Sequence, residues 1–127
     1  MTKTKMKQDT AIITQRKQAL EKELDRIVAI LIEKYKPEKI ILFGSLATGR
    51  IHEWSDIDLL IIKQTDKRPL DRVLEAYSLL GNYREPMDII VYTPAEVELL
   101  LNEGSFFVAE ILTEGKVLYE KDDHAVA

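Results

Sequence analysis

Apolar residues in the first third of the chain recur at steps of three and four, the spacing of one face of a helix. The pattern predicts a helix from Leu20 onward, with inward positions at Leu20, Leu24, Ile27, Val28, Leu31 and Tyr35. Pro37 should end this helix, because the residue before a proline is driven out of the helical region. Ile12 and Ile13 allow an upstream extension, with Thr10 as its cap.

Shorter apolar runs predict four strands, at residues 39–43, 57–62, 87–92 and 116–119. The first two runs are apolar at almost every position, so both faces of these strands should be covered. Between them, the segment 45–49 is too short for more than a turn or two of helix.

Proline, glycine and capping residues delimit three further helices. Pro69 begins one, Gly81 suits its exit, and its expected buried stripe is Leu70, Val73, Leu74, Tyr77 and Leu80. The segment 93–96 is a capping box for a second helix, from Pro94 to about Asn102. Ser105 can cap the third, which carries Phe106, Phe107, Ala109, Ile111 and Leu112. Phe106 and Phe107 are expected in the core, with one ring available to a partner.

The order of these elements predicts an α/β fold in which a mixed central β-sheet is flanked by helices. The turn at Ser45 leaves the end of strand 39–43, whereas Asp56 and Asp58 stand at the start of strand 57–62. These ends coincide only if the two strands are antiparallel neighbours. The helix that follows implies a right-handed parallel crossover to strand 87–92. Asp88 should then lie at the same sheet edge.

Length and charge narrow the class of protein. The 127 residues suggest one domain, 1–127, in which 1–9 and 121–127 are expected to be mobile tails. Its 22 acidic and 18 basic residues give a net charge of −4, which opposes direct nucleic-acid binding. No apolar run has the length of a membrane span, and we expect no membrane contact and a cytoplasmic location. Without cysteine, a metal must use oxygen ligands, His52 or His124.

The stretch between the first two strands carries the candidate chemistry. Gly44 lets the backbone approach a bulky anion, and the turn beginning at Ser45 can present N–H groups to phosphate. Asp56 and Asp58 are two residues apart, so their side chains leave one face of a strand and can hold a hard divalent cation. Asp88 adds a third carboxylate.

Each of these residues also has an ordinary structural interpretation. An isolated Asp-x-Asp often caps a turn before a strand, Ser45 can simply start a helix, and Asp88 can be a solvated strand start. Arg50 is either a surface charge or a partner for phosphate. His52 and Trp54 are expected to pack over the sheet edge, although Trp54 could stack on a base. The convergence of several features, rather than any single one, favours a functional site.

Gly-Ser, ten residues and then Asp-x-Asp resembles the signature of the DNA polymerase β-like nucleotidyltransferases. More narrowly, the chain resembles the minimal nucleotidyltransferase (MNT) antitoxins encoded beside HEPN-domain toxins, over about residues 20–119. The likeness rests on Gly44, Ser45, Asp56 and Asp58 at this spacing, and on Asp88 where the family has its third acidic residue.

The resemblance implies ATP as substrate and two Mg²⁺ ions as cofactor, bound by Asp56, Asp58 and Asp88. Asp88 would also draw the proton from the acceptor hydroxyl, and Gly44, Ser45 and Arg50 would bind the nucleotide. The implied partner is a HEPN-domain ribonuclease toxin, neutralised when AMP is transferred to one of its tyrosines. Two alternatives stay open: a non-catalytic antitoxin that acts by binding, and a small-molecule nucleotidyltransferase of the aminoglycoside type.

Overall fold

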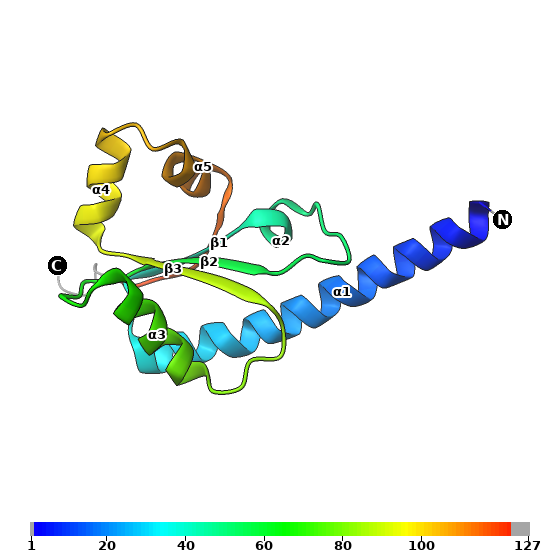
Figure 1. The fold of residues 1–127 in the computed structure, drawn as a ribbon, viewed down its shortest axis with the longest axis horizontal. Helices are drawn as coiled ribbons and strands as arrows, with labels where there is room; N and C mark the ends of the chain where they lie inside the picture. The colour runs from blue at the N-terminus through cyan, green and yellow to red at the C-terminus, as the bar shows by residue number, and fades with distance from the viewer. Residues whose placement is uncertain (1, 123–127) are drawn as a thin grey trace.

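A four-stranded mixed sheet forms the centre of the computed structural model, which describes residues 2–122 and side chains from residue 9 (Figure 1). The strands lie in the order β3-β2-β1-β4, with bounds Lys39–Phe43 (β1), Ile57–Ile62 (β2), Met87–Tyr92 (β3) and Lys116–Glu120 (β4). The helices are α1 (Thr2–Ile30), α2 (Gly44–Thr48), α3 (Pro69–Leu80), α4 (Pro94–Asn102) and α5 (Phe106–Glu114). The predicted fold class, an α/β fold with a mixed central sheet flanked by helices, is confirmed.

The pairing of the strands follows the predicted topology. β1 and β2 are antiparallel neighbours, and β2 and β3 are parallel, joined through α3. β4, whose place the sequence did not indicate, pairs antiparallel with β1 on its other side. The ends of β1, β2 and β3 that carry the candidate chemistry therefore meet at one end of the sheet.

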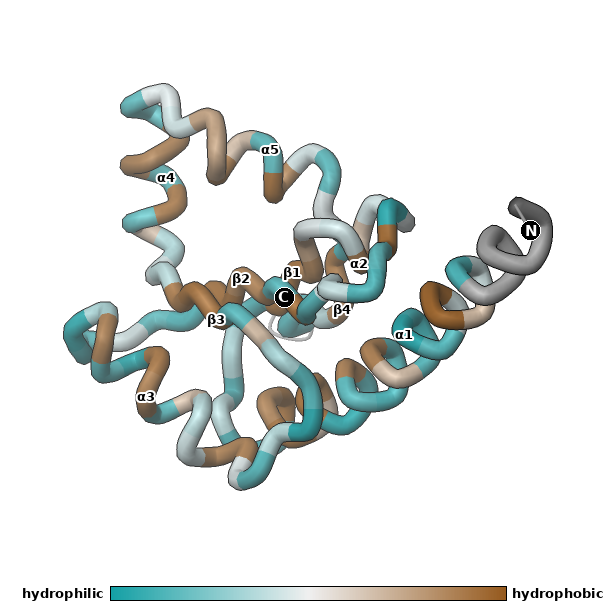
Figure 2. Tube along the Cα trace, turned by 45° about the vertical axis from the view of Figure 1, so that its right-hand side comes forward, coloured by the Kyte–Doolittle hydropathy of each residue, from teal (hydrophilic) through white to brown (hydrophobic). Residues whose placement is uncertain are grey.

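Two apolar layers hold the helices against the sheet. On β2, Ile57, Leu59 and Ile61 face α1 and α3, whereas Leu60 and Ile62 face α4 and α5. All but Ile62 are fully buried, and each such side chain contributes about 1.5–3 kcal/mol by leaving water. The prediction that β2 is covered on both faces is confirmed. In Figure 2 the strands carry much of the hydrophobic colouring.

Helix α1 is longer than expected. It begins at Thr2, so Thr10 does not cap it, and residues 2–9, which were expected to form a mobile tail, are helical. Extending a helix that is already anchored avoids the cost of nucleation, which explains why a polar segment without periodicity continues it. A π-helical turn, Leu31–Tyr35, follows, and Lys36 exits with a left-handed φ of 55° just before Pro37, as predicted. Met1 and residues 123–127 of the predicted tails lie outside the described residues.

Helix α3 has the predicted bounds but presents a different face. Leu70 and Leu74 are 68% and 56% exposed, whereas Arg72 is buried together with Ala76 and Leu80. The Arg72 guanidinium donates to Glu96 Oε1 at 2.6 Å, to the Lys67 carbonyl at 2.7 Å and to the Val91 carbonyl at 3.3 Å. These partners offset the cost of burying the charge, so the predicted stripe is wrong at its two exposed leucines.

The helices on the other face begin where the capping residues predict. The Thr93 hydroxyl accepts from Glu96 N–H while Glu96 accepts from Thr93 N–H, which completes the capping box of α4. Ser105 caps α5 by accepting from Val108 N–H. The core positions of α5 are Val108 and Ile111. Phe106 is 90% exposed, as expected for one of the two rings, but Phe107 is 46% exposed, so the expectation that the other ring lies in the core is wrong. No helix of residues 2–122 is long and apolar enough to span a membrane.

Candidate active site

Three side chains form a row across one face of the sheet, on adjacent strands. Phe43 on β1 is opposite Asp58 on β2, and Asp58 is opposite Asp88 on β3. Side chains two apart on a strand share a face, and Leu60 and Ile90 belong to the layer under α4 and α5. The row therefore lies on that face, and Asp88 stands beside Asp58 at the predicted sheet edge.

The carboxyl groups of Asp56 and Asp88 both affect the pKa of Asp58. Burial raises the pKa of Asp58 to about 7, and the charge of Asp56, a hydrogen bond between these two carboxyl groups and the charge of Asp88 act in the same direction. Asp56 and Asp58 are thus close neighbours, and both are less exposed than Asp88. Such crowding of like charges is relieved when a cation binds between them.

Gly44 is packed directly against this carboxylate pair. Its φ is 74°, in the left-handed region, and a Cβ placed there would lie 2.1 Å from Asp58 Oδ2 and 3.0 Å from Asp58 Cγ. Both the conformation and the space at this position therefore require glycine. The sequence indicated that Gly44 allows a close approach of the backbone to phosphate. In the structure, the group that the backbone approaches closely is the Asp58 carboxylate.

Ser45 is held in a small polar network. Its hydroxyl donates to the Ser55 hydroxyl at 2.9 Å, and Ser55 also accepts from His52 N–H at 2.9 Å. The network fixes the start of α2 against the segment that leads into Asp56. Ser45 therefore has a structural role, and its phosphate contact stays a prediction.

The segment before Asp56 is anchored by a residue that sequence reasoning missed. Arg16, on α1, donates through Nε and Nη2 to the Ser55 carbonyl at 3.0 and 2.8 Å, and through Nη1 to Glu85 at 2.5 Å. Ser55 is 1% exposed, directly before the first aspartate. The position of Ser55 directly before Asp-x-Asp could have marked it as part of the site. No sequence pattern near Arg16 indicates its contact with Ser55, 39 positions away.

The remaining predicted residues stand apart from this packed centre. Arg50 is exposed and forms no ion pair within residues 9–122, so its contact with phosphate stays a prediction. Trp54 is 81% exposed, which contradicts the expectation that it packs over the sheet edge. His52 accepts from Trp54 N–H through Nδ1 at 3.2 Å and shapes the loop.

The donor set fits a hard divalent cation such as magnesium. The Asp56–Asp58 pair offers carboxylate oxygens, the ligands that magnesium prefers, and its crowded charge needs a counterion. Within the described part of the chain, no three acidic or histidine side chains are gathered into a ready cluster for a metal. The close Asp56–Asp58 pair is thus the part of the predicted ligand set that the geometry brings together, and Asp88 as a third ligand stays a prediction.

The mixed sheet places the Asp58 carboxylate against the Gly44 turn and beside Asp88, an arrangement that fits the nucleotidyltransferase class of protein. Residues 25–124 match the family described as "Polymerase beta, Nucleotidyltransferase", and the chain belongs to this family.

Two relatives come from Methanocaldococcus jannaschii. The chain is 36% identical over 112 residues to "Putative protein adenylyltransferase MJ1305", covering 81% of this chain and 76% of that one. It is 39% identical over 104 residues to "Putative protein adenylyltransferase MJ0604", covering 78% and 97%. A solved structure, "a putative nucleotidyltransferase from Sulfolobus solfataricus", is similar with a TM-score of 0.62 at 17% identity, covering 88% and 90%. That structural likeness supports the fold.

Proposed function

We propose that this protein transfers AMP from ATP to a hydroxyl group of a partner protein. The observation that carries the proposal is the row Asp58–Asp88 with Gly44 packed against Asp58, in a chain of the nucleotidyltransferase family. The names of the two relatives, protein adenylyltransferases, support a protein as the acceptor.

The chain's own residues have distinct tasks in this reaction. Asp56 and Asp58 would hold Mg²⁺, with Asp88 completing the ligand set, and the metal would supply positive charge opposite the triphosphate. Asp88 accepts the proton of the acceptor hydroxyl, whose oxygen forms a bond to the α-phosphorus. The bond from the α-phosphorus to the bridging oxygen breaks, and pyrophosphate leaves. The Gly44–Ser45 turn offers N–H groups to the phosphates.

We infer that the acceptor is a tyrosine of a HEPN-family ribonuclease toxin and that this chain is its antitoxin. The inference rests on the resemblance of the Gly-Ser and Asp-x-Asp motifs to the MNT antitoxins. The 90% exposure of Phe106 is consistent with a protein partner, because exposed aromatic side chains are frequent anchors at interfaces.

The metal assignment is tested by calorimetry with ATP and magnesium. Asp56→Asn and Asp58→Asn should weaken magnesium-dependent ATP binding at least about tenfold and leave the fold intact, since each substitution removes one charge from a crowded pair. Asp66→Asn is the matched control, because Asp66 is an exposed aspartate beyond the opposite end of β2. Unchanged binding in both site variants would refute the metal site.

The role of Asp88 is tested by separating binding from transfer. Asp88→Asn should bind magnesium-ATP with at most modest weakening but lose transfer about 100-fold or more, as expected for a general base. Transfer at the wild-type rate in this variant would restrict Asp88 to a structural role.

A second function is favoured by one observation. Phe106, 90% exposed at the start of α5, offers an apolar contact that requires no chemistry. An antitoxin acting by occlusion would use it and would neutralise its partner equally well with Asp56→Asn.

A further inference from the structure

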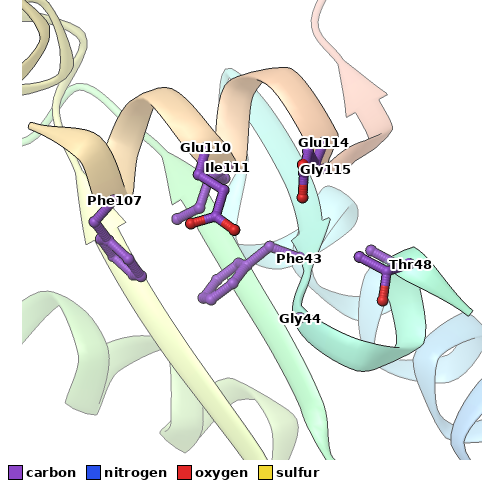
Figure 3. A pocket seen from close by; sticks show the side chains of 9 residues that line it. Phe43, Gly44, Thr48, Phe107, Glu110, Ile111, Glu114 and Gly115 are labelled. Atoms are coloured by element: carbon purple, nitrogen blue, oxygen red, sulfur yellow. The ribbon is translucent and has the colours of Figure 1, made fainter. Parts of the chain in front are cut away.

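A cavity of about 150 Å³ lies between α2 and α5, next to the turn at Gly44 (Figure 3). Its walls include Phe43, Gly44 and Ala47 on one side and Phe107, Glu110 and Glu114 on the other. Phe43 and Phe107 meet edge to face, with ring centroids 5.8 Å apart. The aromatic rings of Phe43 and Phe107 give the cavity flat apolar walls on which a planar ring system can pack.

The cavity adjoins the carboxylate row directly. Phe43 is opposite Asp58 in the sheet, and Gly44 is packed against Asp58 Oδ2. A ligand in the cavity would therefore sit beside the phosphate turn, on the β1 side of Asp58. Asp88, which would receive the acceptor's proton, is on the β3 side. The two sides of Asp58 thus offer separate places to nucleotide and acceptor.

The polar groups of the cavity define what it can bind. Glu110 and Glu114 are one helical turn apart on α5, so both carboxylates come from one face of the helix, as Figure 3 shows. None of the described residues that line the cavity is basic. Carboxylates accept hydrogen bonds and repel phosphate, so the site suits a flat ring that carries N–H donors.

We propose that this cavity receives the base of the ATP, with its exocyclic amino group donating to Glu110 or Glu114 and its ring against Phe107. The inference rests on the proposed function, since it places the base of the same nucleotide whose phosphates reach the Gly44–Ser45 turn. The same arrangement predicts selectivity among bases: a base without an exocyclic amino group, such as the uracil of UTP, turns carbonyl oxygens toward the carboxylates and is disfavoured.

Calorimetry with two probes, ATP and inorganic tripolyphosphate, tests the proposal in the presence of magnesium. Phe107→Ala should weaken ATP binding about tenfold by removing the stacking surface, while tripolyphosphate binding is unchanged. Phe106→Ala is the matched control, because its ring is adjacent in sequence, 90% exposed and not part of the cavity. It should leave both affinities unchanged.

A second pair of variants tests the choice of base. In the double variant Glu110→Gln, Glu114→Gln, the amides can both donate and accept, so the preference for ATP over UTP should fall about tenfold or more. Both glutamates are exposed, which makes misfolding an inadequate explanation for such a change.

Several outcomes would overturn the proposal. Unchanged ATP affinity in Phe107→Ala, an equal loss for ATP and tripolyphosphate, or an unaltered preference for ATP over UTP in the glutamine variant would each remove the base from this cavity. Wild-type protein that binds ATP no better than tripolyphosphate would refute this inference alone. Wild-type protein that binds neither probe would refute the proposed function, and the inference with it.

Discussion

At Gly44 the absence of a Cβ atom matters both for the backbone conformation and for the carboxylate site. The left-handed φ of 74° lets β1 turn sharply into α2, and the missing Cβ leaves room for the Asp58 carboxylate. Asp58 in turn is positioned by its pairing with Phe43 and Asp88 in the sheet. A side chain at position 44 would therefore displace the Asp58 carboxylate and disturb its pairing with Asp56.

Gly44→Ala should cost about 1–3 kcal/mol of folding stability from backbone strain and should also abolish magnesium-dependent ATP binding, because its Cβ would lie 2.1 Å from Asp58 Oδ2 and displace that carboxylate. Gly104→Ala is the control: its φ is 83°, but nothing lies within 4 Å of the added Cβ. It should show a similar loss of stability in urea unfolding with ATP binding intact. Wild-type ATP affinity in Gly44→Ala would contradict the geometry described.

Residues of the site were predictable where the signal is local. The spacing of Gly44, Asp56 and Asp58, together with the strand order that it implies, was sufficient to bring Asp88 alongside Asp58, as the register confirms. Arg16 escaped prediction because its contact with Ser55 joins segments 39 residues apart. No local pattern distinguishes such an arginine from a surface charge.

At the scale of elements, α3 shows how a polar interaction can override an apolar pattern. Period alone placed Leu70 and Leu74 inward, yet the helix turns Arg72 inward to reach Glu96 at the start of α4. That ion pair links helices on opposite faces of the sheet through residues 24 positions apart. Capping residues, whose partners lie within three positions, were predicted correctly for α4 and α5.

Arg72→Leu should destabilise the protein by about 1–3 kcal/mol, because it removes the ion pair with the partly exposed Glu96 and leaves the buried Val91 carbonyl without this donor. Arg68→Leu is the control at the start of the same helix. Its ion pair with Asp71 is exposed, so the loss should be about 0–1 kcal/mol. Equal urea midpoints for the two variants would show that α3 is not held by the Arg72 interactions.

At the scale of the whole molecule, the larger apolar core and the carboxylate row lie on opposite faces of the sheet. The face under α1 and α3 contains the larger apolar layer, whereas the opposite face has its core under α4 and α5 and its carboxylate row at the exposed end. Helix α1 runs along the first face and extends past the sheet, and its Arg16 reaches the segment before Asp56 (Figure 1). The larger apolar layer thus lies on the face opposite the carboxylate row.

The most direct test of the central claim is the intact mass of the neighbouring gene's product after incubation with this protein, ATP and magnesium. A gain of one AMP mass per modified hydroxyl is expected. The gain should be lost with Asp56→Asn, strongly reduced with Asp88→Asn and retained with the control Asp66→Asn. A partner that is bound and neutralised without any change in mass, equally well by wild type and by Asp56→Asn, would contradict it.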